Sequence, residues 1–577
     1  MLNEVNHLII RFFAALRMTV IPGSLLLLTL NVAAQEGKSR EQELEYFQKY
    51  ACRSIHEINI RVINPAGTSL NPLTLDTLPH KELIVNKIHS RSGWRNVKKL
   101  LLFREKDWLE PSVLVDCQRN LRQNGNYNDA LIVVEEIPGT NDVKVTVIVQ
   151  DNQSLAIATG LWEGRFFLGF NLNNFLNLGH RFSSSISFNY DIKNPLTLRS
   201  RYAIPNLFRT RFNLSGNCEI DRYGQRYGFA LERNFVLLED KWAGRVESYW
   251  NTDYTFFNND QNREKLSFNY QDIWVARSFK VGLIEKLSKY ARVITSVRAY
   301  RKVYGNAPGS ETYSPFKNNG YVLASIGIAN LDYYQTRFIY YFGSSEYLPR
   351  GINFSITGGM NYQEIYRTHC YLGMKINYGK LFRKGGYLFG QLSNGNYISN
   401  YGYSKGVINA TIRYITPQLR LAEDWGIREF IKVDGIFGIS KPAAENYSFK
   451  GMQGAKYDQP GVLVGPKGLS MRLETVVYDP LVVLGFKSNA FFFANFGVVG
   501  QHDNVSSLFK SRVFQGYGLG LRLSHSKLAL NFVELSFAWY PTGHLAGTSP
   551  IGWGVVGENL NAIEADNLFS PDVISAE

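Results

Sequence analysis

The stretch YGLGLRLS, residues 517–524, places an apolar side chain at every second position, with glycine, arginine or serine between. Neighbouring positions of a β-strand point to opposite faces, so this segment should form a strand with one apolar and one small or polar face. The wet face of a soluble sandwich usually carries long polar side chains that cover the backbone. Small residues instead fit the crowded interior of a barrel whose apolar face meets lipid. We therefore expect a transmembrane β-barrel.

The same alternation recurs from Leu161 onward, for example in FSSSISFNY (182–190), YLGMKINYGK (371–380) and INATIRY (408–414). Lys375, Arg413 and Arg522 all fall on the small or polar face. A charge on the lipid side would cost about 2–4 kcal/mol near the middle of the membrane, so that face is assigned to the lumen. At about 24 residues per strand with its share of turns, residues 161–541 predict about 16 antiparallel strands.

Composition agrees with this fold class. Aromatic residues make up 14% of the 577 residues, charged residues only 19%, and the mean hydropathy is −0.18. Beyond the N-terminus the sequence contains no run of 18 or more apolar residues, so helical membrane spans are not expected. The fold should be mainly β.

Residues 1–34 read as a secretory signal peptide, because Arg11 and Arg17 precede the apolar VIPGSLLLLTLNVAA and a cut is expected before Gln35. The mature chain should be exported. The polar leader 35–54 is expected to be a short helix or disordered.

The formal charge is +14, which raises the possibility of a nucleic-acid partner. The basic residues are spread along the chain without a compact basic motif, so we expect acidic lipid headgroups or a cationic lumen instead, and no nucleic acid. Cysteines 52, 117, 218 and 370 fit no metal-binding spacing. A disulfide is permitted by an exported location but not indicated.

Residues 55–152 predict a small α+β domain in the periplasm. IHEINIRVI (55–63) alternates as a strand. Pro111 suits the first turn of a helix in which Leu114, Cys117 and Leu121 recur at helical spacing. VKVTVIVQD (143–151) then reads as a further strand.

This domain resembles a POTRA domain of the BamA/TamA superfamily of outer-membrane assembly and translocation proteins. The resemblance is carried by LLFREKDWLEPSVLVDCQRNLRQNGNYNDALIVVEE (101–136) and VKVTVIVQDNQSL (143–155), in which the positions matching the motif are Arg119, Leu121, Arg122, Tyr127 and Asp151. It implies a POTRA domain that engages client polypeptides, followed by a sixteen-stranded barrel whose seam or lumen passes them.

Two further segments resemble a luminal loop tip and its contact on the barrel wall in that superfamily. KGMQGAKYD (450–458) places Gln453 and Gly454 at the tip, and FANFG (493–497) places Phe493, Asn495 and Gly497 on the wall. The superfamily has an arginine at the tip and an acid on the wall. We expect a neutral Gln453–Asn495 hydrogen bond in place of that ion pair. The alternative is two unrelated amides.

GFNLNNFLNLGHRFS (169–183) resembles the first barrel strand of the superfamily, with Asn174, Phe175 and Gly179 carrying the match. A first strand that pairs weakly with the last would open a lateral gate; the alternative is an ordinary hairpin. LNFVELSFAWYP (530–541) reads as the closing strand. The barrel is therefore assigned to 160–541 and a C-terminal tail to 542–577.

No catalytic signature is present: H-E-x-x-H is absent, GPKG (465–468) lacks the P-loop pattern, and the histidines lie in no recognised triad motif. We expect no enzymatic activity, no metal and no cofactor. The expected function is insertion, assembly or translocation of other proteins in a bacterial-type outer membrane. Its partners would be membrane lipids, unfolded clients and accessory proteins. The alternatives are a passive pore or structural barrel, and a hydrolase with a dispersed triad.

Overall fold

The structure is a computed structural model. It describes residues 38–65, 92–152, 154–162, 165–189, 196–221, 224–237, 239–256, 263–286, 288–306, 317–330, 332–336, 339, 345–363, 369–383, 385–399, 402–420, 425–439, 447–448, 464–483, 486–500, 508, 510–525, 533–541, 551–556 and 570–574. The expected signal peptide (1–34) and the expected tip residues Gln453 and Gly454 lie outside these residues.

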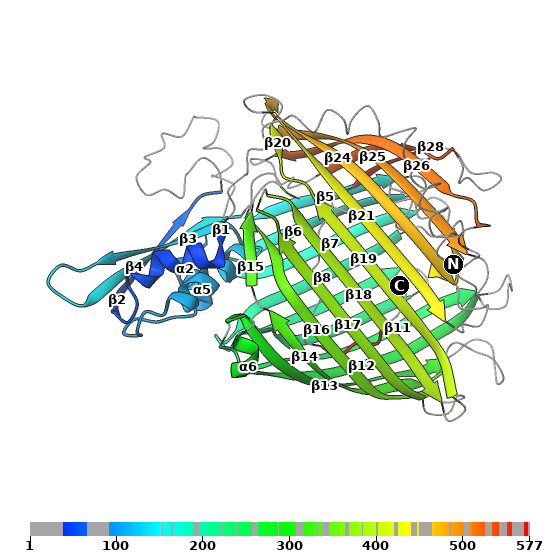
Figure 1. The fold of residues 1–577 in the computed structure, drawn as a ribbon, viewed down its shortest axis with the longest axis horizontal. Coiled ribbons are helices and arrows are strands. Elements are labelled where there is room, and N and C mark those ends of the chain that lie inside the picture. The colour runs from blue at the N-terminus through cyan, green and yellow to red at the C-terminus, as the bar shows by residue number, and fades with distance from the viewer. Residues whose placement is uncertain are drawn as a thin grey trace.

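The N-terminal domain has the chain order strand, helix, helix, strand, strand (Figure 1). These elements are β2 (Ser54–Ile63), α4 (Trp94–Leu100), α5 (Pro111–Gln123), β3 (Tyr127–Glu136) and β4 (Asp142–Asp151). β4 is central: it pairs in parallel with β2 and antiparallel with β3. A parallel pair needs a long crossover, which the two helices supply. The expected α+β domain is therefore present, and α4 is a helix that sequence reasoning missed.

The core of this domain lies between α5 and the three-stranded sheet. Leu114, Cys117 and Leu121 are completely buried, as their helical spacing predicts, and they pack with buried valines of β4. The leader is helical from Arg40, because α2 (Arg40–Gln48) begins with a capping box in which Ser39 and Gln42 exchange hydrogen bonds. No helix in the described part of the chain is long and apolar enough to cross a membrane.

The rest of the chain forms one large antiparallel sheet. Its main strands are β5 (Leu155–Trp162), β6 (Arg165–Phe175), β7 (His180–Asn189), β8 (Leu196–Leu207), β9 (Phe212–Asp221), β10 (Gln225–Arg233), β11 (Trp242–Phe256), β12 (Arg263–Phe279), β13 (Ala291–Asn306), β14 (Asn319–Asn330), β16 (Glu346–Gln363), β17 (His369–Leu381), β18 (Tyr387–Ser399), β19 (Gly402–Ile415), β21 (Gly426–Ile439), β24 (Lys467–Val483), β25 (Phe486–Gly500), β26 (Phe514–His525), β27 (Val533–Trp539) and β28 (Ile551–Val556).

The pairings of these strands return to their starting point, since β9 pairs with β10 and β28 pairs with β5. Short strands extend this ring: β15 (Asp332–Thr336) continues the pairing of β14 with β16, and β20 (Leu419–Arg420) pairs with β21. β1 (Lys38–Ser39) pairs with β15 and so joins the N-terminal domain to the sheet. We call the ring the barrel.

The predicted number of about 16 strands is wrong. The described residues place 20 strands in the ring, after β1, β15 and β20 are set aside from the 23-stranded sheet. Turns are shorter than assumed, as between β9, which ends at Asp221, and β10, which begins at Gln225. Strands also form outside 161–541, where the alternating pattern is too short to stand out.

Both ends of the barrel assignment change accordingly. β5 precedes the segment expected to hold the first strand, so Asn174 and Phe175 end the second strand, β6. β27 is not the closing strand, because it pairs with β28, and β28 in turn pairs with β5. The residues that follow 541 therefore include a strand of the ring.

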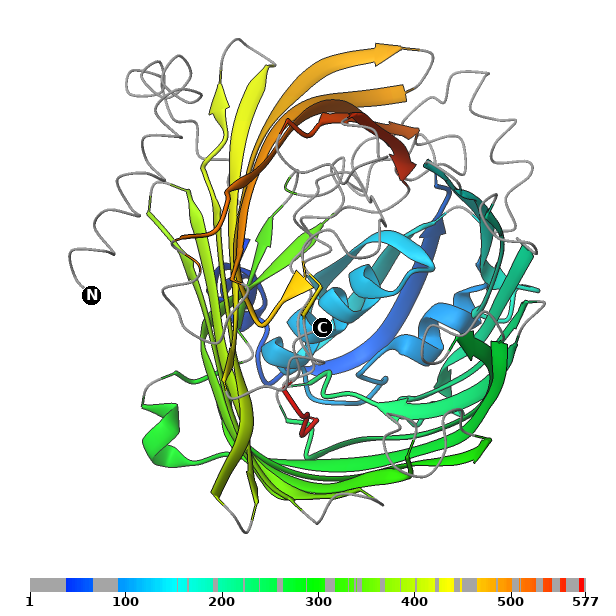
Figure 2. The same ribbon diagram turned by 90° about the vertical axis from the view of Figure 1, so that its right-hand side faces the viewer.

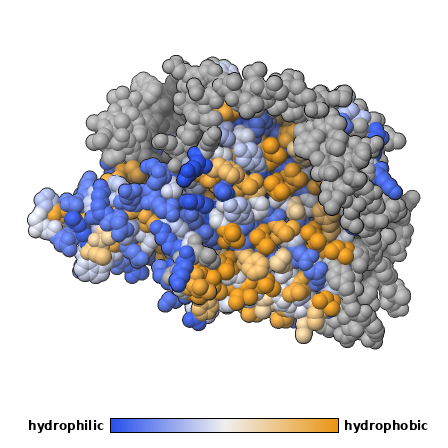
Figure 3. Space-filling model, in the orientation of Figure 1, coloured by the Kyte–Doolittle hydropathy of each residue, from blue (hydrophilic) through white to orange (hydrophobic). Residues whose placement is uncertain are grey.

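The alternation of faces in the opening stretch is confirmed. Leu519 and Leu521 are 54% and 45% exposed on the outer face, whereas Arg522 is 4% exposed on the inner face. The inner glycines make room for aromatic rings: a Cβ on Gly518 would overlap the ring of Phe493. Figure 3 shows apolar residues gathered over the strands of the barrel, beside a largely hydrophilic N-terminal domain.

Candidate functional site at the junction of domain and barrel

The N-terminal domain lies across one opening of the barrel. Figure 1 shows it at one end of the strands, and Figure 2, a view along the barrel, shows its helices within the outline of the ring. Side chains of α2, α4 and α5 contact the strand connections at this end. We call these contacts the junction; they include most of the residues that the POTRA-like motif predicted.

Arg122 of α5 joins elements from both parts of the junction. Its Nε lies 2.8 Å from Asp129 Oδ1, and its Nη1 lies 3.2 Å from Glu43 Oε1. The same Nη1 donates to the hydroxyl of Tyr347 on β16, at 3.1 Å. Burial disfavours the guanidinium charge, but Tyr347, Asp129 and Glu43 outweigh it and raise the pKa of Arg122. Its partners satisfy the buried charge, as a stable buried ion requires.

Arg119, on the same helix, reaches the barrel directly. It donates to the carbonyl oxygen of Val236 at 3.1 Å, and its guanidinium lies 4.6 Å from the centre of the Tyr333 ring. Asp116 accepts from Arg40 of α2 at 3.0 Å, and Arg40 lies over the ring of Tyr290. Cationic side chains on two helices therefore contact carbonyl and aromatic groups at this end of the barrel.

Asp151 links the domain to the opposite side of the junction. It is completely buried, and its Oδ2 accepts from the Ser92 amide at 2.7 Å. The Ser92 hydroxyl accepts from Asn174 Nδ2 at 3.0 Å. Tyr127 pairs with Asp151 in the sheet, and burial raises the pKa of its phenol. Two motifs that are separate in the sequence thus meet through Ser92, which sequence reasoning missed.

Asn174 organises the turn between β6 and β7. Its backbone is left-handed (φ 53°), and its Oδ1 accepts from the Gly179 amide at 2.8 Å and from Asn96 Nδ2 at 3.3 Å. The backbone amide of Asn174 donates to Asn126 Oδ1 at 3.2 Å. Asn126 also donates to the Gly179 carbonyl at 3.0 Å. One asparagine side chain therefore both closes the turn and binds the domain.

The next turn at this end of the barrel, between β8 and β9, has the same arrangement. Asn206 is also left-handed (φ 51°), and its Oδ1 accepts from the Arg211 amide at 2.8 Å, again five residues on. Its side-chain amide donates to the carbonyl of Lys99 on α4. Helix α4 therefore forms hydrogen bonds with two neighbouring turns that have the same asparagine arrangement. The detectable signal is an asparagine followed by two apolar residues in both NFLNLG (174–179) and NLFRTR (206–211).

The structure places the remaining motif residues elsewhere. Leu121 belongs to the domain core. Phe175 ends β6, and its ring lies 5.6 Å from that of Phe182 and 6.1 Å from that of Tyr202. The junction therefore unites Arg119, Arg122, Asp151, Asn174 and Gly179.

The expected wall contact is only partly described. Asn495 is 2% exposed on β25, and its amide has no hydrogen-bond partner among the described residues. Phe493 points inward and its ring lies 4.7 Å from the guanidinium carbon of Arg472, while Gly497 ends the pairing with β26. Because Gln453 and Gly454 lie outside the described residues, the Gln453–Asn495 contact stays a prediction.

A buried charge cluster adjoins this wall position. Glu474 lies 2.6 Å from Arg472 and 2.7 Å from Arg522, and Arg522 lies 2.9 Å from Glu534. Two acids face two bases, so the cluster is neutral across β24, β26 and β27. Alternation places Arg522 on the inner face, but it does not predict that Glu474 and Glu534 lie beside it.

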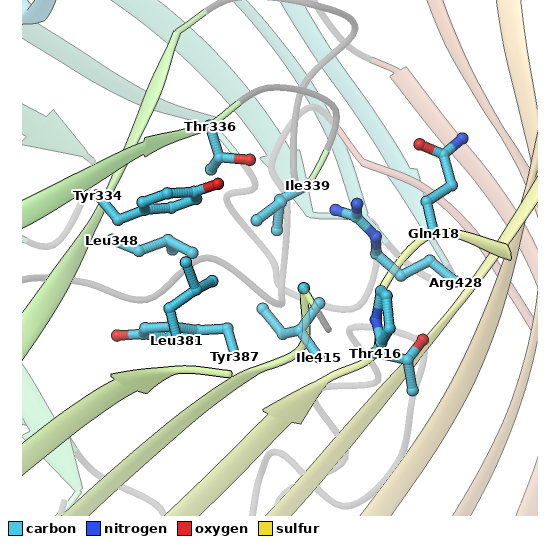
Figure 4. A pocket seen from close by; sticks show the side chains of 12 residues that line it. Tyr334, Thr336, Ile339, Leu348, Leu381, Tyr387, Ile415, Thr416, Gln418 and Arg428 are labelled. Atoms are coloured by element: carbon cyan, nitrogen blue, oxygen red, sulfur yellow. The ribbon is translucent and has the colours of Figure 1, made fainter. Parts of the chain in front are cut away.

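A pocket opens on the inner wall near the junction (Figure 4). Leu348, Leu381, Ile415 and Arg428 are among its lining residues, and its enclosed space of about 20 Å³ has room for about one water molecule. Within the described ranges no group of three His, Cys, Asp or Glu residues is placed to hold a metal ion.

No protein-family model and no curated protein matches the chain. Among solved structures, BamA from Haemophilus ducreyi lacking POTRA domains 1-3 is 10% identical with a TM-score of 0.38, over 86% of this chain and 84% of that one. CdiB from Acinetobacter baumannii is 12% identical with a TM-score of 0.41, over 96% and 97%. CdiB from Escherichia coli is 9% identical with a TM-score of 0.41, over 87% and 76%.

The chain is thus similar to BamA and CdiB structures over most of its length.

Proposed function

We propose that this protein inserts, assembles or translocates other proteins in a bacterial-type outer membrane. The apolar outer face and polar inner face of the barrel support a wall that meets lipid outside and water inside. The domain at residues 55–152 would be a POTRA-like domain in the periplasm that engages unfolded clients, with accessory proteins as further partners. The barrel would contact membrane lipids.

The observation that carries the proposal is the weakness of the seam between β28 and β5. Among the described residues these strands share two residue pairs, Gly554 with Trp162 and Val555 with Leu161. By contrast, β27 and β28 share six pairs and β11 and β12 share fifteen. Opening this seam breaks few hydrogen bonds and exposes two strand edges. An exposed edge pairs readily with an added strand, which is how a client strand would be templated.

The junction supports the same proposal. Its contacts are largely side-chain hydrogen bonds and cation–aromatic contacts, such as those of Arg119 and Asn174, rather than a continuous apolar core. Interfaces of this polar kind permit one domain to move against another. A domain that shifts at the opening would let a client segment pass from it to the seam or the lumen.

We also propose that Gln453 and Asn495 form a neutral amide contact on the inner wall. The burial of Asn495 supports it, because a buried amide gains from a partner that both donates and accepts. A Q453C/N495C pair tests it: disulfide formation under mild oxidation is expected, and two free thiols would refute the contact.

The seam is tested by locking it. In a chain whose native cysteines are replaced, L161C and V555C are register partners across β5 and β28. L519C and F537C are the matched control, since they are partners across β26 and β27. Client insertion into liposomes should stop when the seam pair is oxidised and return on reduction, while the control pair has no effect.

Undiminished insertion through a locked seam would refute the templating role. Steady conductance in planar bilayers without insertion by the unlocked protein would favour the passive pore instead. Esterase or protease activity of the detergent-solubilised protein would favour the hydrolase.

A further inference from the structure

The segment Ser570–Ile574 lies inside the barrel, where Figure 2 shows it in red within the ring of strands. It follows β28 in the sequence but contacts β13 and β17, on another part of the wall. The segment forms neither helix nor strand, and it lies against the inner face. The wall at this point therefore holds a piece of polypeptide that is not part of the sheet.

Arg298 of β13 makes the polar contacts at one end of the segment. Its Nη1 pairs with the carboxylate of Asp572 and donates to the Pro571 carbonyl at 3.2 Å. The other side of the same guanidinium is held by Asp272, with both bonds at 2.9 Å. Asp272 thus orients Arg298 and leaves one donor edge for an incoming acid.

Tyr371 of β17 holds the other end. Its hydroxyl accepts from the Ile574 amide at 2.8 Å. The backbone of Ile574 approaches Gly395 so closely that a Cβ there would lie 3.0 Å from the Ile574 oxygen. Main-chain contacts of this kind recognise an extended peptide without regard to most of its side chains.

Tyrosines continue this surface along the wall. The rings of Tyr300 and Tyr321 stack at 4.7 Å, the hydroxyls of Tyr321 and Tyr397 lie 3.0 Å apart, and the rings of Tyr397 and Tyr371 lie 5.3 Å apart. Aromatic side chains of this kind supply contact area at a low cost in conformational entropy.

Charge complementarity agrees with the contacts. Residues 557–577 contain five acidic residues and no lysine or arginine, in a chain whose formal charge is +14. On the wall, Arg298 pairs with Asp572 and Lys375 acts on the same carboxylate electrostatically. An acidic segment is therefore drawn to a cationic part of the inner face.

We propose that Arg298, Asp272, Tyr371 and Gly395 form a binding site for an extended acidic polypeptide, which the chain's own residues 570–574 occupy. The site takes a carboxylate at Arg298 and, two residues later, a free backbone amide at the Tyr371 hydroxyl. In the working protein an acidic segment of a client competes with residues 570–574 for this site, and this identification of the competitor rests on the proposed function. Binding of such a segment displaces the tail.

The test measures how accessible residues 570–574 are to a labelling reagent in the full chain. Cys52, Cys218 and Cys370 are replaced by serine and Cys117 by alanine, and V573C reports the rate of labelling by a maleimide dye in detergent. D572N, which leaves the Arg298–Asp272 pair intact, should speed labelling at least about tenfold, since hydrogen bonds to charged groups are the stronger ones. Y371F should act in the same direction.

R245Q is the matched control on the wall. Arg245 lies on the inner face of β11 and pairs with Glu247 at 2.9 Å, and the described residues give it no contact with the tail. The peptide LFSPDVI should speed labelling of the chain in which V573C is the only change to residues 570–574, whereas LFSPKVI should not.

The proposed site would be refuted if the labelling rate of V573C stayed the same in D572N, in Y371F and in the presence of millimolar LFSPDVI. Insertion of clients into liposomes is measured on the same variants. If clients are inserted normally while the labelling rate of V573C does not change, this site alone is refuted. If LFSPDVI displaces residues 570–574 in a protein that inserts no client, the site is supported and the proposed function is refuted.

Discussion

Replacing Glu474 by glutamine should destabilise the barrel strongly. Glu474 is 1% exposed and accepts from Arg472 at 2.6 Å and from Arg522 at 2.7 Å. Glutamine has nearly the same shape but no charge. It would leave two buried arginines with Glu534 as the one carboxylate of the cluster.

The expected loss follows from the burial of these charges. Removing one partner of a buried ion pair costs about 3–5 kcal/mol, because the remaining charge is left uncompensated in a medium of low polarity. Since 1.36 kcal/mol corresponds to a factor of ten, the folding equilibrium constant should fall by about two to four powers of ten. Removing Arg472 as well as Glu474 should cost less than the sum of the single losses, because the remaining pair is neutral.

The measurement is urea-induced unfolding in detergent micelles, followed by tryptophan fluorescence. E219Q is the matched control: Glu219 pairs with Arg199 at 2.7 Å, but the Arg199 side chain is 58% exposed. An exposed pair contributes about 0–1 kcal/mol, so E219Q should unfold nearly as the unmodified protein does. An E474Q protein no less stable than E219Q would refute the assignment of a buried, energetically coupled charge cluster.

Three further predictions concern the turn, the packing and the core. N174A should speed amide hydrogen exchange in residues 92–100, because it removes hydrogen bonds to the domain and places alanine at a left-handed backbone position. G518A should cost about 1–3 kcal/mol in urea unfolding by crowding Phe493, whereas G390A should cost less, since its Cβ would meet no atom of the described residues within 4 Å. Burial raises the pKa of Cys117 to about 12 from 9.0, so its thiol should resist Ellman's reagent at pH 8 until the protein unfolds; the contribution of Cys117 to stability should be constant below pH 9.0 and fall above it, because the folded state keeps this proton longer.

The faces of the strands could be predicted residue by residue. Alternation placed Leu519 outside and Arg522 inside because side-chain direction along a strand depends on position alone. The number of strands could not be predicted in the same way. β28, six residues long, has too short a pattern to be distinguished from a loop without its partners β27 and β5.

The junction was predicted in its motifs but not in its contacts. Arg122, Asp151 and Asn174 were singled out, yet nothing in the chain before Pro111 marked Ser92 as the group that connects Asp151 with Asn174. α4 is seven residues long, and Lys98 and Lys99 interrupt its short apolar pattern. Its position depends on the two barrel turns that receive it.

The sequence by itself determined the two-faced wall and the helix of the N-terminal domain, because both follow from periodicities of two and about 3.6 residues that act within one element. Only the tertiary structure decided the ring of 20 described strands, the weak seam at β5 and the place of residues 570–574 inside the barrel. These features depend on which distant segments meet, and local side-chain spacing carries no information about that choice.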